Sequence, residues 1–187
     1  MYTLFVTDQF EDQDVGYVPI DRSRFLEYTE GYITHQLSSL SLDALACIRS
    51  WPCLVMREGR SDEHAYVAEI RQIRHESNEI RLALDLIPNN RQIVNDALWK
   101  LRESLDIEKF EFNRNHWAVK ETDLFDALAV GGFGFEPETI ARFKLLPLPT
   151  PARAELLRLK GRVAQWGHTA IDNFLLEAGV DGPSHAE

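Results

Sequence analysis

A period of two is the clearest pattern of apolar and polar residues in this chain. Over residues 79–87, isoleucine or leucine stands at every even position from 80 to 86, with charged or small residues between, which predicts a strand with one buried face. Residues 53–57 and 64–74 predict two more strands, and the turn sequences GRSD and ESN separate the three. The stretch from Cys53 to Ile87 is therefore expected to form an antiparallel meander.

The middle strand of this meander alternates less cleanly than the third. Val67 and Ile70 fall on opposite faces, whereas Ile70 and Ile73 are three positions apart, which predicts a β-bulge or burial of both faces. A curled unit of this kind can build a small barrel, and the pattern leaves open whether the sheet closes. Five arginines and seven acidic residues over 53–87 do not favour a barrel that binds phosphate.

Helical periodicity lies on both sides of the meander. One helix is expected over residues 23–37, and a second begins after the N-cap Ser41 and ends before Pro52. Residues 93–105 predict a third helix, on which Trp99 points away from the main apolar arc. Trp99 then either fills a second buried face or faces a partner, where aromatic residues are enriched.

Three further elements complete the body. They are a short strand over 2–6 followed by an acidic loop over 8–19, a hairpin over 110–119 with its aromatic residues on one face, and a helix over 124–130 with Thr122 or Asp123 as its N-cap.

A proline-rich connector, LLPLPTP, follows at residues 145–151. Beyond it, apolar residues form one helical stripe over 152–166 and another over 169–178, with Gly167 between them, which predicts a helical hairpin. Two short helices cannot bury such a face on each other alone. The expected fold class is α+β: a body over 1–145 with a small antiparallel β-sheet, meander plus hairpin, packed with helices, then the connector and C-terminal helical hairpin over 146–187.

Length and charge narrow the classes of function. A chain of 187 residues fits one domain with a small appendage. No run approaches the roughly 18 apolar residues of a membrane span, and the first residues lack a signal-peptide pattern, so we expect a cytoplasmic protein with no membrane partner. The net charge of -10 makes nucleic acid an improbable partner for the whole surface. Residues 1–52 carry three arginines against eight acidic residues, whereas residues 142–168 carry six basic residues against one.

The cysteine and histidine content indicates no metal site and no cofactor. Cys47 and Cys53 lie among apolar residues and are expected to be buried free thiols. The six histidines are scattered, without the spacing of a zinc site.

The basic residues of the C-terminal hairpin suggest a surface for another protein. On a helix over 152–166, Arg158 and Arg162 flank the apolar stripe on one side, and Arg153 and Lys160 flank it on the other. The leading hypothesis is a non-enzymatic interaction module, an adaptor or subunit of a bacterial complex, which binds another protein or a second copy through residues 152–178. Its candidate binding residues are Trp99, Arg153, Arg158, Lys160, Arg162 and Trp166.

Two alternatives come from other classes of protein. Arg162 and His168, in RVAQWGH, have a separation similar to the Arg and His of HEPN-type ribonucleases, which implies a phosphate-binding arginine and an acid/base histidine. Gly167 interrupts the single helix that this family requires. A sensor of a small ligand or nucleotide is the other alternative, with a pocket beside the sheet near Tyr66, Arg71 and Trp117.

Two stretches, NRNHWAVKETDLFDAL and GHTAIDNFLLEAGV, resemble parts of uncharacterised bacterial proteins, including proteins from phage-defence loci. This resemblance assigns no residue a role.

Overall fold

The computed structural model describes residues 1–8, 17–87, 92–143 and 145–149. Its strands are β1 Tyr2–Val6, β2 Tyr17–Asp21, β3 Pro52–Met56, β4 His64–His75, β5 Glu79–Leu86, β6 Ile93–Val94 and β7 His116–Lys120. Its helices are α1 Gly31–Leu37, α2 Leu42–Ser50, α3 Asn95–Leu101, α4 Leu124–Val130 and α5 Pro137–Ile140, with the 3-10 turns η1 Arg22–Arg24 and η2 Lys109–Asn113.

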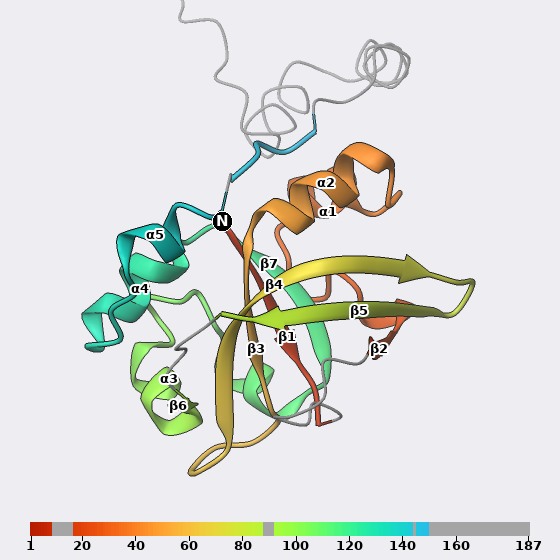
Figure 1. Ribbon diagram of the computed structural model, residues 1–187. Helices are drawn as coiled ribbons and strands as arrows, with labels where there is room; N and C mark the ends of the chain where they lie inside the picture. Colours follow the sequence, from red (N-terminus) through yellow and green to blue (C-terminus); the bar gives the residue numbers. More distant parts are fainter. Residues whose placement is uncertain (9–16, 88–91, 144, 150–187) are drawn as a thin grey trace, which may run out of the picture.

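All seven described strands belong to one mixed sheet of order β2-β5-β4-β3-β1-β7, with β6 paired to the start of β4 (Figure 1). The pair β1–β3 is parallel, whereas β1–β7, β3–β4, β4–β5 and β2–β5 are antiparallel. The prediction of a small antiparallel sheet is therefore wrong in size and in direction. The cause is long-range pairing: β1 lies between β3 and β7, which are distant from it in sequence, and no local pattern encodes that position.

The predicted meander is confirmed as β3, β4 and β5. The expected irregularity in the middle strand is a β-bulge, because the register with β5 shifts between Ile70 and Gln72. The extra residue, Arg71, is exposed and forms an ion pair with Asp85 across the two strands. The β4–β5 arm extends beyond the rest of the sheet (Figure 1).

The sheet curls until the chain after β2 reaches β7. Phe25 forms an isolated bridge with Trp117, and Val119 N donates a hydrogen bond of 2.8 Å to the Thr29 hydroxyl. The segment 25–29 thus covers the edge of β7, which would otherwise present unpaired backbone groups. Leu26 and Tyr28 in this segment have φ of 62° and 59°, a left-handed conformation that costs a non-glycine residue about 1 kcal/mol or more.

Two hydrophobic cores lie on the two faces of the sheet. The first contains Phe5, Val55, Leu82 and Trp117 and is covered by α1 and α2 through residues such as Ile33 and Ile48. The second contains Leu4, Met56, Val67 and Ala118 and is covered by α3 and α4 through residues such as Leu98 and Leu124. In Figure 1 the α1–α2 pair and the group α3, α4 and α5 accordingly occupy different sides of the sheet. β1, β3 and β7 are buried on both faces.

Two predicted helix starts are confirmed by their caps. The Ser41 hydroxyl accepts from Ala44 N at 3.3 Å, and Asp123 accepts from the backbone N–H groups of Phe125 and Asp126. Trp51, before Pro52, ends α2 in an extended conformation. After α4, Gly132 has φ of 81°, which favours glycine.

Four predicted elements differ from the structure. The helix expected over 23–37 is confined to α1, because residues 22–28 form η1 and the turn beside β7. The helix expected over 93–105 is divided into β6 and α3. The last residues of the loop expected over 8–19 belong to β2. The first strand of the hairpin expected over 110–119 is instead η2, and β7 pairs with β1. A period of two over three residues is too short to distinguish a strand from a 3-10 turn.

The connector is described only to residue 149, and it contacts the body. Leu148 packs against the first core. The helical hairpin predicted over 152–178 lies outside the described residues. The division into a body over 1–145 and an appendage over 146–187 stays a prediction.

Candidate functional site

Three places in the described chain bring chemically notable side chains together. They are the surface of α3 around Trp99, a buried ionic cluster beneath Tyr28, and the start of the connector beside α2. The first and the third involve regions that the sequence predicts to be functional, and the second does not.

Trp99, a predicted binding residue, is half-buried and has an aromatic neighbour and two cationic ones. The edge of its ring system meets Phe112 at 5.2 Å between centroids. The Arg60 guanidinium lies 4.0 Å from the ring centroid and that of Arg102 lies 5.4 Å away. One portion of Trp99 therefore packs against the second core, as the buried-face interpretation predicts, and Arg60 covers another portion. The partner-facing role stays a prediction.

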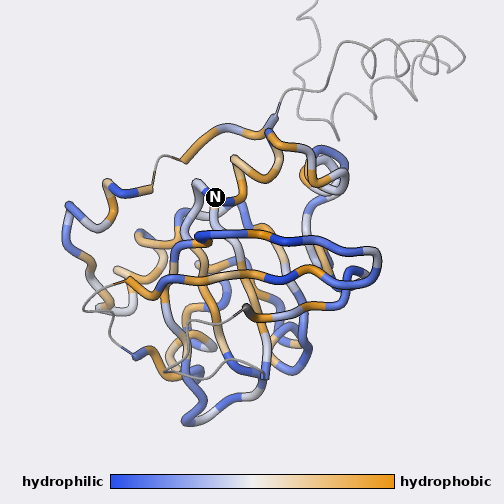
Figure 2. Tube along the Cα trace, turned by 45° about the vertical axis from the view of Figure 1, so that its right-hand side comes forward, coloured by the Kyte–Doolittle hydropathy of each residue, from blue (hydrophilic) through white to orange (hydrophobic). Residues whose placement is uncertain are grey.

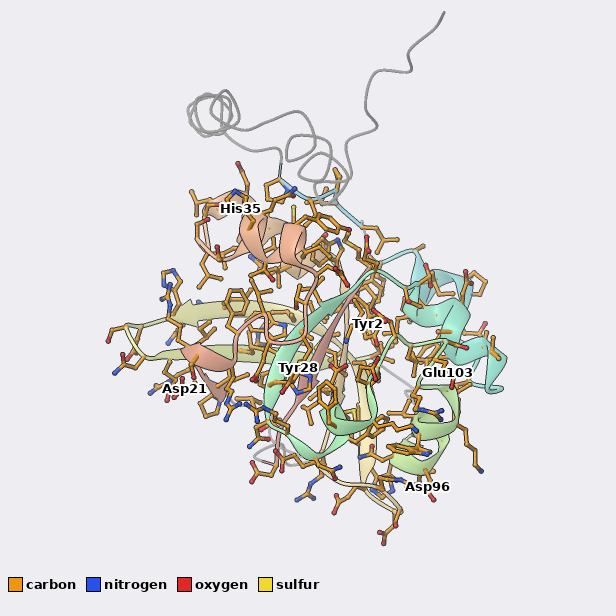
Figure 3. All side chains as sticks on the ribbon, turned by 180° about the vertical axis from the view of Figure 1, so that it is seen from behind. Tyr2, Asp21, Tyr28, His35, Asp96 and Glu103 are labelled. Carbon is orange, nitrogen blue, oxygen red and sulfur yellow. The ribbon has the colours of Figure 1, made fainter. Side chains whose placement is uncertain are left out.

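Carboxylates surround these arginines on the outer side of α3. Asp96 Oδ1 lies 3.5 Å from Arg60 Nη2, and Glu103 Oε1 lies 2.7 Å from Arg102 Nη2. Asp96 and Glu103 both project from this side of the molecule (Figure 3). The side chains of Arg60 and Asp96 are about half exposed, so water screens their attraction.

The second place is a buried cluster of Glu111, His116 and Lys120. The side chains of Glu111 and His116 are completely buried, and that of Lys120 is 4% exposed. Glu111 Oε2 lies 3.0 Å from His116 Nε2, and Glu111 Oε1 accepts from Lys120 Nζ at 2.8 Å. A buried carboxylate is thus held between two nitrogen groups, the arrangement that burial of charge requires.

Local sequence explains how the cluster is held. Glu108 and Glu111 form a capping box on η2, in which Glu108 N donates to Glu111 Oε1 at 2.8 Å. His116 and Lys120 lie four residues apart on β7, on the same face as Ala118, which packs into the second core. The 3-10 turn and the strand together fix all three side chains.

Hydrogen-bond geometry constrains the protons of the cluster. His116 Nδ1 lies 2.6 Å from the Arg114 carbonyl oxygen, which only accepts, so Nδ1 carries a hydrogen. Burial by itself raises the pKa of Glu111, but the hydrogen bonds from His116 and Lys120 and the charge of Lys120 together hold this pKa below its ordinary value.

Tyr28 covers this cluster from the segment 25–29. Its ring meets His116 edge-on at 5.0 Å between centroids and Phe110 at 4.8 Å, and its carbonyl oxygen accepts from Lys120 Nζ at 3.3 Å. In Figure 3, Tyr28 lies beside β7. The covering ring and the complete burial of Glu111 and His116 keep substrate-sized molecules away, so this arrangement acts as an internal tie rather than as an open catalytic centre.

The third place is the start of the connector, which is fixed to the end of α2. Leu146 O accepts from Trp51 Nε1 at 2.9 Å, and Leu146 N donates to the Ser50 hydroxyl at 2.9 Å. The Cys47 thiol donates to Pro147 O at 2.8 Å. The side chains of Leu145 and Leu146 are nevertheless exposed. The backbone of the connector is held while its apolar side chains face outward.

The other predicted site residues have different outcomes. Arg153, Arg158, Lys160, Arg162, Trp166 and His168 lie outside the described residues, so the ribonuclease hypothesis stays a prediction. Tyr66 and Trp117 both line the first core, but the Arg71 side chain is 58% exposed and pairs with Asp85. The hypothesis of a ligand pocket near these three residues stays a prediction.

The two cysteines are free and buried, as predicted. Burial raises the pKa of the Cys53 thiol to about 12, so Cys53 stays protonated and unreactive. Trp117 Nε1, also buried, has no hydrogen-bond partner among the described residues. In the same ranges, no group of three or more His, Cys, Asp or Glu side chains is placed to hold a metal ion.

The helices of the described ranges do not combine the length and the apolar content needed to cross a membrane. Comparisons with protein families, with curated proteins and with solved structures found no match to this chain.

Proposed function

We propose that this protein is an interaction module, an adaptor or a subunit, which binds another protein through residues 152–178. The observation that carries the proposal is the anchored connector. Hydrogen bonds with Ser50, Trp51 and Cys47 fix the backbone of Leu146 and Pro147, so the chain leads toward that segment from a defined point. A fixed origin lowers the entropy lost when a segment binds, which favours a recognition element over a loose tail.

Exposed apolar side chains at the same place add support. Leu145 and Leu146 are exposed although the backbone on either side is held, and contiguous exposed apolar surface is typical of interaction sites. The sequence that follows combines an apolar helical stripe with flanking cations, which suits an apolar surface with an acidic rim.

The test compares two substitutions that introduce the same residue. Leu159→Glu places a charge in the predicted stripe, whereas Ala154→Glu places one on the opposite side of the same helix. The tagged full chain and both variants are purified from the cells that naturally produce the protein, and cross-linked partners are quantified by mass spectrometry. We expect one partner protein to be enriched with the full chain and with Ala154→Glu, and lost with Leu159→Glu.

Equal enrichment with both variants would exclude the predicted stripe as the binding surface. Light scattering on the same samples distinguishes a different partner from a second copy of the chain. If the full chain enriches no protein and is monomeric, the interaction proposal fails.

A further inference from the structure

An apolar surface with an acidic rim lies on the body itself, on the unit formed by α4, α5 and their connecting loop over residues 121–143. We refer to it as the α4–α5 face. Val130 is 74% exposed and Ile140 is 39% exposed, and Phe133 and Phe135 of the connecting loop are only partly buried. Phe133 and Phe135 pack against the second core, so the loop between the exposed Val130 and Ile140 is held to the body.

The charges of this unit have one dominant sign. Residues 121–143 contain five acidic residues and one arginine, Arg142. Asp126, Glu136 and Glu138 are exposed on α4 and around the start of α5. Arg142 lies 3.8 Å from Glu69 on β4, so the one cation of the unit is partly neutralised by another element. The α4–α5 face therefore offers apolar contacts with carboxylates around them.

The complementary sequence lies in the same chain. Residues 152–166 combine an apolar stripe with Arg153, Arg158, Lys160 and Arg162, against Glu155 as the one acidic residue. This stripe can bury its apolar side chains against those of the α4–α5 face, and its flanking cations can pair with the carboxylates there.

The position of the connector makes this contact possible within one molecule. Residue 145 follows the end of α5 by only five positions, and the connector leaves the body between α5 and α2 (Figure 1). The stretch that leads out is apolar in character, as the colouring in Figure 2 shows. Only residues 150 and 151 separate the described connector from the stripe, and two extended residues span about 7 Å. The predicted stripe and hairpin, 27 residues in all, thus follow directly from a connector whose first residues come shortly after α5.

We propose that residues 152–178 dock on the α4–α5 face of their own chain when no partner is bound. Docking covers the same apolar stripe that the proposed function assigns to a partner, so the biological meaning of docking rests on that function. The partner and the α4–α5 face then compete for the stripe. A partner must then exceed the affinity of the internal contact, and the effective concentration of the tethered segment sets that threshold.

Trypsin provides the test, because it cleaves after Arg153, Arg158, Lys160 and Arg162. A docked segment is cleaved only after it opens. The cleavage rate in the full chain is compared with that in a synthetic peptide of residues 150–187, by mass spectrometry of intact products. We expect cleavage in the full chain to be at least about tenfold slower than in the peptide, since proteolysis follows the population of the open form.

Substitutions on the body complete the design. The double variant Val130→Ser/Ile140→Ser removes apolar contacts without creating a trypsin site, and the control Leu42→Ser changes a residue that is 86% exposed at the start of α2. We expect the double variant to be cleaved at nearly the rate of the peptide and Leu42→Ser at the rate of the unchanged chain. Circular dichroism verifies that the exposed substitutions leave the body folded.

Cleavage of the full chain at the rate of the peptide would overturn internal docking, and so would protection that the double variant retains. Protection that disappears on dilution assigns the contact to a second copy, which also overturns the proposal. These outcomes are distinct from those that test the proposed function. If the segment is protected but captures no partner, internal docking is supported and the proposed function fails. If the segment is unprotected but captures a partner, internal docking fails and the proposed function is supported.

Discussion

The cluster beneath Tyr28 and the surface around Trp99 use the same kinds of side chain in opposite surroundings. Glu111, His116 and Lys120 lie in the protein interior, with Glu111 Oε1 and Lys120 Nζ 2.8 Å apart. Arg60 and Asp96 lie in water, 3.5 Å apart. Burial strengthens every electrostatic interaction in the first region and raises the cost of breaking it, whereas solvent reduces both in the second.

This difference separates structural from functional roles. A buried ion pair tolerates no loss of a partner, so the cluster fixes η2, β7 and the segment 25–29 relative to one another. An exposed cation over an aromatic ring contributes little to the stability of the fold, so the contact of Arg60 with Trp99 can be broken at small cost. Substitutions in the two regions should therefore differ in size and in kind.

The largest effect is expected for Glu111→Ala. Removal of this carboxylate leaves Lys120 and His116 buried without their acceptor, which costs about 3–5 kcal/mol of the free energy of unfolding. Urea denaturation measures this free energy. The control is Glu103→Ala, since the Glu103 side chain is 85% exposed and its pair with Arg102 is worth about 0–1 kcal/mol. Equal losses in the two variants would remove the distinction between the regions.

A smaller effect is expected for Thr29→Val, which tests the segment that covers the cluster. The Thr29 hydroxyl accepts from Val119 N at 2.8 Å, and its loss leaves this N–H unpaired at the edge of β7. The cost should be about 1–3 kcal/mol, the penalty of an unsatisfied buried group. Hydrogen exchange at Val119 should accelerate. Thr29→Ser keeps the hydroxyl and should restore most of the stability, and a failure of this rescue would show that the hydrogen bond is not what secures the segment.

The two regions also differ in how far sequence reveals them. Trp99 stands out in the sequence because it lies opposite the apolar arc of its predicted helix. Its contact with Arg60 could not be predicted, because Arg60 lies in the β3–β4 turn and no local pattern links the two residues. The cluster was missed, although HWAVK carries a signal: His116, Ala118 and Lys120 share one face of a strand. A lysine and a histidine on the face that packs into a core require a buried acceptor, and Glu111 and Glu121 both lie five positions from His116.

The fold shows the same limit. The meander from 53 to 87 is local, so alternation and turn residues predict its strands and its bulge. The parallel pair of β1 and β3 joins residues about fifty positions apart, and Thr3 opposite Cys53 has no marker in either segment. Burial of β1 on both faces erases the alternation that would have shown its direction. Pairing of this kind follows from the packing of the whole chain rather than from any local stretch.

The third prediction concerns how the free energy of unfolding changes at low pH. The folded-state pKa of Glu111 lies below its ordinary value near 4.5, so its ionised form stabilises the fold above that pH, and this contribution is lost as pH falls further toward the folded pKa. The difference in unfolding free energy between the unchanged chain and Glu111→Gln should shrink below pH 4.5, by at most about 1.4 kcal/mol per pH unit for one proton.

Glu103→Gln provides the control for this pH dependence. The pKa of Glu27 is also lowered, but Glu27 is present in both chains and cancels in the comparison. A difference for Glu111→Gln that stays constant from neutral pH to pH 3 would contradict the assignment of an ionised Glu111 to the folded state.

The smallest effect is expected at Trp99. The informative quantity is the coupling energy between Trp99 and Arg60 rather than the stability lost in either single variant. A double-mutant cycle with Trp99→Ala and Arg60→Ala should give a coupling of about 0.5–1 kcal/mol, typical of a cation over a ring in water. The cycle of Trp99 with Arg102, whose guanidinium lies 5.4 Å from the ring centroid, should give less. Coupling larger than that of the buried cluster would mean that Trp99 is part of the structural core, and the recognition role assigned to this surface would then be wrong.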